Sequence, residues 1–476
     1  MRCIRSWLAS VVCVTGMGLM LMCLWSNGAR AQDIRTYKIQ TYTDWLQKYA
    51  NAKPDFKPGD VLTAKDLERM RPFVPPGMLE QLNFPEFRAP IVAAEAHIPR
   101  KDYMDCTEKY SGQTRLAADG ALENYVCGQP FPLSAISLDD PQAGLKAAWN
   151  YEWKWQNLGY IEMDHEWCWV RNGGSHPNTG PMNAEAPPQE FITGIKFTTP
   201  FPKGIHRYFG GGGTIERTLG GFYQKTIFTH HAYLSGGSLP IADAKDFEFK
   251  EITYFAEPFD IRGTTFIIYR YLDPHRAEEA WAYIPTLRRV RRISAEVRSD
   301  SLLGTDLTIE DYYGFNGQVL EWNWKFLGWK DILAVNDPKD DYARMYGPNG
   351  TIPDDRWSVK KMAVLLRTPK WSRHPYSAAI NFWEPDSWLG PLHVVFDRKN
   401  ELWKVVIWEW KYSEDFKEWT ELLRGAHAMA WLHLSAIDVQ NNRATVISGF
   451  GPGFPNYPMA QIQSTFDINR LEQIHR

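Results

Sequence analysis

Short runs of aromatic and β-branched residues, each ended by Gly, Asn or Asp, dominate the chain after about residue 103. Runs of this length and composition predict β-strands. Because they follow one another at short spacing, the pattern predicts an antiparallel sheet rather than alternating strands and helices. The expected strands are 192–198, 213–233, 248–256, 261–272, 280–298, 306–328, 379–384, 392–397 and 401–411.

Residues 32 to about 100 have a different pattern, which predicts an N-terminal arm of helical and extended pieces. Helical periodicity after a starting Thr occurs at 43–49 and 63–70, and Pro72 ends the second helix. We expect residues 101–476 to form the β domain. Its other expected elements are a hairpin of 109–117 and 122–126 about Ala118-Asp119-Gly120, a helix or extended crossover at 141–156, and a helix at 423–437.

Four Trp-x-Trp pairs stand out: 153/155, 167/169, 322/324 and 408/410. Side chains at i and i+2 of a strand share a face, so each pair places two indoles side by side. Together they predict an apolar floor for an acyl chain, a sterol or another hydrophobe. An ordinary filled sheet core is the alternative, and the 153/155 pair shares no face if it is helical. The candidate ligand-binding residues are Trp322, Trp324, Trp408, Trp410, Trp153, Trp155, Trp281 and Tyr283.

Four arginines lie at 288, 289, 291 and 292, inside a run from Trp281 to Ile293 that otherwise resembles one strand. Strand alternation places Arg289 and Arg291 on one face. A solvated edge is one interpretation of this cluster. The other is an interior pair that binds Asp306 or Asp311 downstream, because a guanidinium can hold a carboxylate with two hydrogen bonds. The candidate latch residues are Arg289, Arg291, Asp306 and Asp311.

Three segments of the chain resemble the DUF1329 family, which is related to the LolA/LolB lipoprotein carriers. They are Gly128-Gln-Pro-Phe-Pro132 with Asp140-Pro-Gln-Ala-Gly144 through Asn150; residues 281–317, ending Gly314-Phe-Asn-Gly317; and Phe396-Asp-Arg398 through Lys404. The resemblance implies a mainly β (α+β) fold, a large curved antiparallel sheet or half-barrel with helices over its concave face. It also implies an acyl-chain carrier in which an interior arginine contacts the lid.

The first thirty-one residues resemble an export signal, with Arg2 and Arg5 before an apolar run and Ala29-Arg30-Ala31 at a cleavage site. We therefore expect cleavage after Ala31 and a periplasmic location; an uncleaved membrane anchor is the alternative. Loss of Arg2, Arg5 and Arg30 changes the formal net charge from −3 to −6. Interleaved charges of this balance do not predict nucleic-acid binding.

Cys106, Cys127 and Cys168 remain after the signal. An oxidising compartment permits a Cys106–Cys127 disulfide, but a simple two-residue turn at 118–120 would not place these cysteines opposite each other. The sequence leaves that disulfide open. Cys168 is expected to be a small buried residue rather than a reactive thiol.

Signatures of catalysis, metal binding and cofactor binding are thin. The sequence has no Gly-x-Ser-x-Gly, His-Glu-x-x-His or Cys-x-x-Cys, and Gly210–Gly213 lacks the Lys of a phosphate loop. His230 and His231 would point to opposite faces of a strand. We therefore predict no catalytic residue, no metal and no cofactor.

The function predicted from the sequence is a non-catalytic periplasmic carrier or chaperone of a hydrophobic ligand, such as a lipid, a lipoprotein acyl chain or a sterol-like molecule. Two alternatives stay open. One is an accessory subunit of an envelope transporter or outer-membrane complex, with the aromatic residues as a partner surface. The other is a hydrolase whose site residues are dispersed along the sequence.

Overall fold

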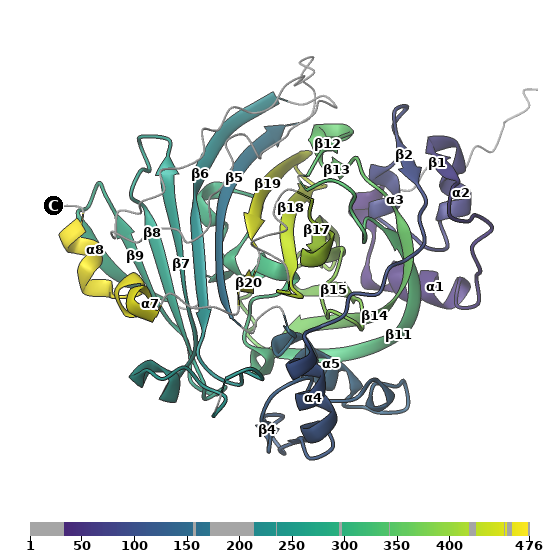
Figure 1. Ribbon diagram of the computed structural model, residues 1–476. Helices are drawn as coiled ribbons and strands as arrows, with labels where there is room; N and C mark the ends of the chain where they lie inside the picture. The colour runs from purple at the N-terminus through teal and green to yellow at the C-terminus, as the bar shows by residue number, and fades with distance from the viewer. Residues whose placement is uncertain are drawn as a thin grey trace, which may run out of the picture. The chain divides into compact units, whose positions relative to one another are not determined.

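The computed structural model describes residues 33–155, 159–171, 214–234, 236–294, 298–341, 343–417, 425–451, 453–454 and 459–474. Residues 34–476 form one compact unit (Figure 1). Within the described residues, no helix combines the length and the apolarity that crossing a membrane requires. The helices are α1 (Ile39–Lys48), α2 (Leu67–Met70), α3 (Met78–Gln81), α4 (Lys101–Tyr110), α5 (Ala143–Glu152), α7 (Met459–Thr465) and α8 (Ile468–Ile474).

A large curved antiparallel sheet is the centre of the fold. Its order is β10-β9-β8-β7-β6-β5-β19-β18-β17-β16-β15-β14-β11, and β20 pairs beside β5. β10 and β11 are the two edges, so the sheet does not close into a barrel. Its strands are β5 (Tyr160–Arg171), β6 (Thr214–Ile227), β7 (Phe247–Glu257), β8 (Thr265–Tyr271), β9 (Glu279–Ile284), β10 (Arg289–Ile293), β11 (Trp322–Ala334), β14 (Ser358–Pro369), β15 (Ala378–Trp383), β16 (Leu392–Phe396), β17 (Leu402–Tyr412), β18 (Met429–Asp438), β19 (Arg443–Gly451) and β20 (Gly453–Phe454).

Three two-stranded sheets lie outside the large one. They are β1 (Val61–Thr63) with β2 (Arg88–Pro90), β3 (Arg115–Leu116) with β4 (Leu122–Glu123), and β12 (Met345–Tyr346) with β13 (Ile352–Pro353). The predicted fold class is confirmed: the chain is mainly β, with few helices and an open, curved antiparallel sheet.

One face of the sheet, which we call the outer face, packs against helices from both ends of the chain. Side chains of 34–91 form one core with alternate residues of β14 to β17, such as Val364, Phe382 and Val405. At the other end of the sheet, α7 and α8 cover Ile252, Tyr269 and their neighbours. Figure 1 shows α1–α3 outside the bend of β11, and α7 and α8 outside β8 and β9.

The opposite, inner face packs against α5 and a run of short 3-10 turns that leads into β11. Gly144 allows α5 to lie directly on that strand, because a Cβ at this position would stand 2.7 Å from the carbonyl oxygen of Trp324. The Asp140-Pro-Gln-Ala-Gly144 motif therefore marks a close helix-to-strand contact.

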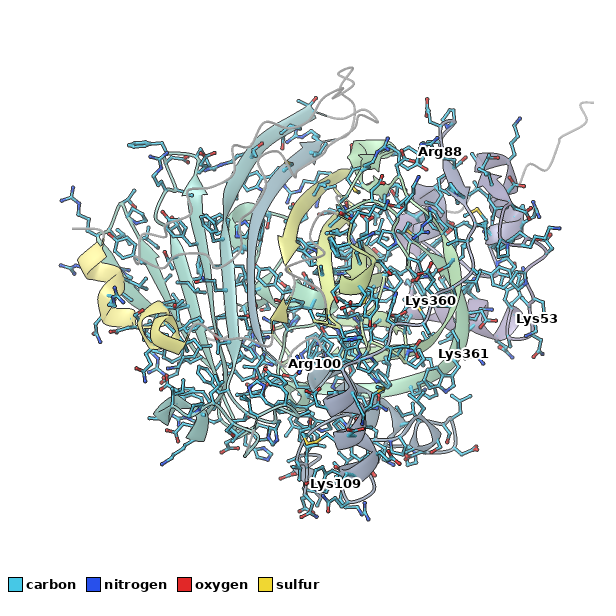
Figure 2. The ribbon with its side chains drawn as sticks, in the orientation of Figure 1. Lys53, Arg88, Arg100, Lys109, Lys360 and Lys361 are labelled. Atoms are coloured by element: carbon cyan, nitrogen blue, oxygen red, sulfur yellow. A yellow bond between two sulfur atoms is a disulfide. The ribbon has the colours of Figure 1, made fainter. Side chains whose placement is uncertain are left out.

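A buried charge cluster joins the end of the N-terminal arm to the sheet. His97 lies between Asp337 (3.3 Å) and Glu384 (3.2 Å), and the ammonium of Lys360 on β14 bridges the same carboxylates at 3.0 and 3.2 Å. Figure 2 labels Lys360 and the neighbouring Lys361. Two cations and two anions satisfy one another here, so the cluster fixes the arm without a lone buried charge.

Protonation of this cluster follows from its contacts. Burial by itself lowers the pKa of His97, but the hydrogen bonds to Asp337 and Glu384 outweigh it and raise the pKa to about 9. Burial raises the pKa of both carboxyls, yet His97 and Lys360 lower them to about 2. His97 is therefore a cation at neutral pH.

Several predicted elements are confirmed. The strands expected at 248–256, 379–384, 392–397 and 401–411 are β7, β15, β16 and β17, and those expected at 213–233 and 261–272 contain β6 and β8. Residues 141–156 contain helix α5, and the first predicted helix is α1. The segment 192–198 lies outside the described residues.

Other predicted elements were wrong. The run 280–298 is not one strand but the hairpin β9–β10, with its turn at 285–288. Residues 306–321 form 3-10 turns, and only the end of the expected strand 306–328 belongs to β11. The segment 423–437, expected to be a helix, contains most of strand β18, which begins at Met429, and β5, β14 and β19 are strands that the sequence patterns did not predict. The hairpin at 109–126 is reduced to β3 and β4, because Lys109 and Tyr110 end helix α4.

Helix α4 explains how Cys106 and Cys127 form a disulfide, which the sequence had left open. This helix places Cys106 opposite Cys127, with 5.8 Å between their Cα atoms, and the two are joined. The bond lies near Lys109, at the lower end of Figure 2. Cys168 is buried on β5, as expected.

We predict that His97→Gln destabilises the protein in a pH-dependent way. The folded pKa of about 9 lies above the ordinary value of 6.5, so the charged imidazole stabilises the fold fully below pH 6.5 and loses this effect as the pH rises through 9. Chemical unfolding should show a loss of about 3 kcal/mol at the acidic end of this window and a clearly smaller loss beyond its alkaline end. An equal loss at both ends would contradict the assignment.

Candidate functional site

The inner face carries a cluster of aromatic side chains from β17, from its neighbour β18 and, beyond β19, from β5; we call this cluster the floor. Trp408 and Trp410 of β17 stack with 5.4 Å between ring centroids, and Trp431 of β18 lies 6.4 Å from Trp408. Trp167 of β5 belongs to the same apolar cluster. Trp408 and Trp410 thus share a face, as strand alternation predicted.

Trp322 and Trp324 also lie on the inner face, but in a second cluster beneath α5. Both indoles are hydrogen-bonded: Trp322 Nε1 donates to Glu310 Oε1 (3.2 Å) and Trp324 Nε1 donates to the carbonyl of Val319 (2.9 Å). These contacts hold the turns before β11 against the sheet. The two pairs therefore share one face but not one continuous floor.

The remaining candidate aromatics lie elsewhere. Trp153 follows the end of α5 and Trp155 lies in the next turn, so neither is on a strand; both are buried, Trp153 in the cluster beneath α5 and Trp155 in the floor cluster. Trp281 and Tyr283 belong to the outer face of β9, against α7 and α8. Alternation correctly placed Trp281 and Tyr283 together but could not tell which face they occupy.

A segment of short 3-10 turns and irregular chain covers the floor. We call residues 299–312 the lid and residues 313–316 its anchor. The lid contributes Leu302, Leu307, Ile309 and Tyr312 to the floor cluster. In the anchor, the ring of Tyr313 stacks on Trp410, with centroids 6.1 Å apart.

Four consecutive carbonyl oxygens of the anchor accept hydrogen bonds from buried side chains. The hydroxyl of Tyr151 on α5 shares its single proton between the carbonyls of Tyr313 (2.9 Å) and Phe315 (2.6 Å). Asn381 donates to that of Gly314 (2.9 Å). The carbonyl of Asn316 accepts from Arg270 (2.6 Å) and Arg298 (2.9 Å). Gly314 has φ 90°, which glycine adopts without strain.

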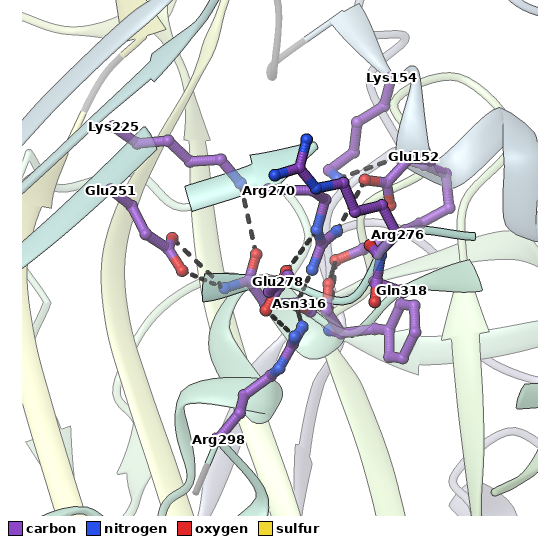
Figure 3. A network of polar contacts seen from close by, with 12 residues as sticks. Glu152, Lys154, Lys225, Glu251, Arg270, Arg276, Glu278, Arg298, Asn316 and Gln318 are labelled. Atoms are coloured by element: carbon purple, nitrogen blue, oxygen red, sulfur yellow. Dashed lines mark hydrogen bonds and ion pairs between the residues drawn. The ribbon is translucent and has the colours of Figure 1, made fainter. Parts of the chain in front are cut away.

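The side chain of Asn316 extends this anchoring into a buried ionic network (Figure 3). Its amide donates to Glu251 at 3.0 Å and its oxygen accepts from Lys225 at 3.3 Å. Arg270, which also holds the Asn316 carbonyl, is paired with Glu152 (3.0 Å) and Glu278. Arg270 is thus neutralised by two carboxylates, whereas Lys225 and Glu251 are both held by the amide of Asn316.

Lid acids are held at three further points, two in the loop between β14 and β15 and one on β19. Glu310 Oε2 contacts His374 Nε2 at 2.6 Å, and Asp311 accepts from the hydroxyl of Tyr376 at 2.6 Å. Burial raises the pKa of Asp311, but its contacts with His393, Lys404 and Tyr376 outweigh burial and hold it well below its usual range. Asp311 is therefore a buried carboxylate.

The third point is the predicted latch acid Asp306, and here the predicted partner was wrong. Asp306 Oδ1 binds Arg443 Nε on β19 at 2.7 Å, and Thr445 donates to the other oxygen at 3.1 Å. Arg289 and Arg291 share the inner side of edge strand β10, as alternation predicted, but both are exposed. They lie on the solvated edge that the sequence also allowed. Arg443 is the arginine that pairs with the lid.

Space around the lid is limited. Between the lid and the floor lies a cavity of about 20 Å³, lined by Trp167, Trp408, Trp431, Tyr312 and Tyr313 among others. At the margin of the lid, a larger open pocket of about 710 Å³ reaches from Ile293, Arg298 and Ser299 to Trp322 and Trp371. The floor is thus closed by the lid, with an open pocket beside it.

His374, beside the lid, is held in a position that does not suit acid–base catalysis. His374 Nδ1 accepts from the backbone N–H of Tyr376 at 2.9 Å, so its proton lies on Nε2, toward Glu310. Both nitrogens are therefore engaged. No group of three or more potential metal ligands occurs among the residues that the structure describes.

Sequence reasoning missed the anchor and its partners. Asn316 lies in the Gly314-Phe-Asn-Gly317 motif, but nothing in the motif indicates that Arg270 and Arg298 are its partners. Tyr312 and Tyr313 had been assigned to a strand. A succession of Asp, Gly and Asn at 306–317 is the one signal that could have indicated turns.

We predict that Arg443→Ala loosens the lid. Loss of the ion pair with Asp306 removes one attachment of the lid while the anchor stays intact. Amide hydrogen exchange at 302–309 should become faster, whereas exchange at 313–316 should not change. Arg291→Ala is the matched control and should leave both segments as in the wild type. Equal exchange in all three proteins would rule out Arg443 as the latch.

The family model described as "Protein of unknown function (DUF1329)" matches residues 61–190 and 216–456. No curated protein matches this chain. A putative outer membrane lipoprotein-sorting protein domain from Vibrio parahaemolyticus is 15% identical, covering 70% of this chain and 100% of its own, with a TM-score of 0.41.

Two further solved structures are similar to this chain. A DUF1329 family protein from Desulfovibrio piger is 16% identical, covering 70% of this chain and 99% of its own, with a TM-score of 0.42. A LolA superfamily protein from Nitrosomonas europaea is 10% identical, covering 64% of this chain and 90% of its own, with a TM-score of 0.33. Since the family model matches far more than half of the residues, the chain belongs to the DUF1329 family.

Proposed function

We propose that this protein is a non-catalytic carrier of a hydrophobic ligand in the periplasm, and that the lid and the ligand occupy the floor alternately. The observation that carries the proposal is the nature of the cover. A broad set of indoles on rigid strands is covered by one-turn segments attached through a few polar contacts, rather than by a further sheet or a long helix. Covers of this kind have low local stability.

Energetics favour replacement of the lid over simple opening. Each exposed aromatic side chain adds about 150–250 Å² of apolar area. At about 25 cal/mol per Å², a bare floor of four indoles would cost on the order of 10 kcal/mol or more. An acyl chain that covers the same area removes this cost. The lid should therefore open when a ligand takes the place of Leu302, Leu307 and Tyr312.

The geometry also supplies an entry route and a fixed end for the lid. The pocket of about 710 Å³ borders Arg298 and Ser299 at the start of the lid. Gly314 lies at the other end, within the fixed anchor. A ligand that enters this pocket meets Trp322 and Trp371 on one side and mixed charges on the other, which fits an amphiphile with a polar end.

Polar groups of the floor fit a ligand that carries an oxygen acceptor. The indole nitrogens of Trp167, Trp408 and Trp431 are buried, and no acceptor for them is present in the described part of the chain. All three rings line the small cavity under the lid. An ester or carbonyl oxygen placed among them would accept a hydrogen bond that the closed form does not provide.

The geometry of the floor and the lid supports the two alternative functions less well. The Trp-x-Trp residues proposed as a partner surface are buried rather than exposed, apart from the partly buried Trp169. An accessory subunit would therefore need another surface. The histidines beside the lid are engaged at both nitrogens or deeply buried, which does not favour a hydrolase.

We predict that detergent-free protein takes up a fatty acid into the floor. A brominated fatty acid should quench tryptophan fluorescence, because bromine would lie against the indoles. Trp408→Leu should weaken binding roughly tenfold or more, as it removes apolar contact area. Arg443→Ala should speed uptake by loosening the lid.

Trp357→Phe provides a matched control, since Trp357 is equally buried but packs against the N-terminal arm on the outer face. This variant should bind like the wild type. Absence of quenching in the wild type and in Arg443→Ala, together with a bare chain mass by native mass spectrometry, would reject the carrier proposal.

A further inference from the structure

Two neighbouring hairpins carry their turns at the same end of the sheet. β7 ends at Glu257 and β8 begins at Thr265, so the turn 258–264 lies at that end. β9 returns to it, because Tyr283 pairs with Thr265, and the turn 285–288 then leads into β10. Figure 1 shows these strands side by side at one side of the sheet.

Each of these two turns presents a large apolar side chain to solvent. Phe259 is 85% exposed, the largest value among the exposed large hydrophobics of the described residues. Leu287 is 44% exposed. Turn residues that serve only to connect strands are ordinarily polar, so two exposed apolar tips on adjacent hairpins indicate contact with an apolar phase.

Arginines surround both tips. Arg288, Arg289 and Arg291 are exposed, and they form no ion pair with a carboxylate in the described part of the chain. Arg262 lies beside Phe259, with its guanidinium 5.8 Å from the ring centroid. Arg217 on β6 is paired with Asp260 of the turn 258–264. Arg292 of β10 is paired with Glu279, so the cations beside the apolar tips that lack an internal counter-charge in the described part of the chain are Arg288, Arg289 and Arg291.

We propose that this end of the sheet docks on the surface of an anionic lipid bilayer. Phe259 and Leu287 would enter the headgroup region, and Arg288, Arg289 and Arg291 would bind lipid phosphates. An apolar tip flanked by arginines matches the layered chemistry of that surface, where phosphates lie just above the acyl chains. Guanidinium groups bind phosphate with two hydrogen bonds.

Other partners fit this surface less well. Two single protruding side chains do not form the continuous apolar area that a stable protein interface buries. The acidic net charge of the whole chain, −3, opposes general attraction to a polyanion, so binding must arise locally. A bilayer requires only local insertion and a few phosphate contacts. This inference concerns a surface remote from the lid and does not depend on the carrier proposal.

Vesicle co-sedimentation tests the proposal with the full mature chain. Wild-type protein should bind vesicles of phosphatidylcholine mixed with phosphatidylglycerol, and should bind pure phosphatidylcholine vesicles much more weakly. The triple variant Arg288→Glu, Arg289→Glu, Arg291→Glu should lose roughly hundredfold in affinity for the mixed vesicles. Phe259→Ser with Leu287→Ser should weaken binding to both kinds of vesicle.

Controls separate this surface from general electrostatics and from the lid. A second triple variant changes three exposed cations of the N-terminal arm and should bind vesicles like the wild type; it carries Lys53→Glu, Lys57→Glu and Lys65→Glu. Arg443→Ala should also bind vesicles normally, whatever its effect on fatty-acid uptake. The proposal would be overturned if wild-type protein did not bind the mixed vesicles. It would also be overturned if the arginine triple variant bound them as tightly as the wild type.

Discussion

Four successive carbonyl oxygens, from Tyr313 to Asn316, accept hydrogen bonds from buried side chains, and the rest of the candidate site depends on this constraint. Backbone groups that leave regular structure inside a protein need partners, since a buried carbonyl without one is costly. Tyr151, Asn381, Arg270 and Arg298 supply those partners. The chain can therefore cross the inner face as turns instead of a strand, which leaves the lid as a separable cover.

The buried ions beneath Asn316 follow from the same need. Arg270 and Arg298 reach the carbonyl of Asn316 only because Glu152 and Glu278 neutralise them inside the fold. Lid residues before Glu310 have weaker attachments than Glu310, Asp311 and the anchor. Asp306 is held by an arginine that is itself 40% exposed, and the apolar contacts of Leu302 and Tyr312 can be exchanged for those of another hydrophobe. A fixed anchor beside an exchangeable cover is the arrangement that a ligand-gated site requires.

Sequence patterns predicted the sheet and its tryptophan pairs well where one face alternated clearly. In β11, buried Trp322 and Trp324 alternate with exposed Asn323 and Lys325, so the period of two is visible. In β18 every residue from Met429 to Asp438 is buried, so no alternation remains, and the Ala- and Leu-containing run resembled a helix. The hairpin at 281–293 was hidden because Pro285-Thr-Leu-Arg288 is short and contains no Gly or Asn.

Local sequence patterns could not predict which residues pair with each other across the fold. Alternation correctly placed Arg289 and Arg291 on one face of β10, yet the lid acid Asp306 meets Arg443, which is 137 residues away in the sequence. Long-range pairing of this kind depends on strand order. Neither the position of β19 beside β5 nor the return of the chain over the floor can be read from spacing along the chain.

Distance measurement between spin labels tests exchange of lid and ligand most directly. Labels at Ser301 on the lid and Lys361 on β14 are both exposed, and a Cys168→Ser background would restrict labelling to them. We expect one narrow distance distribution without ligand and a second, longer population when a fatty acid is added. A single distribution that stays the same at saturating fatty acid, while the fatty acid quenches the floor tryptophans, would contradict the account.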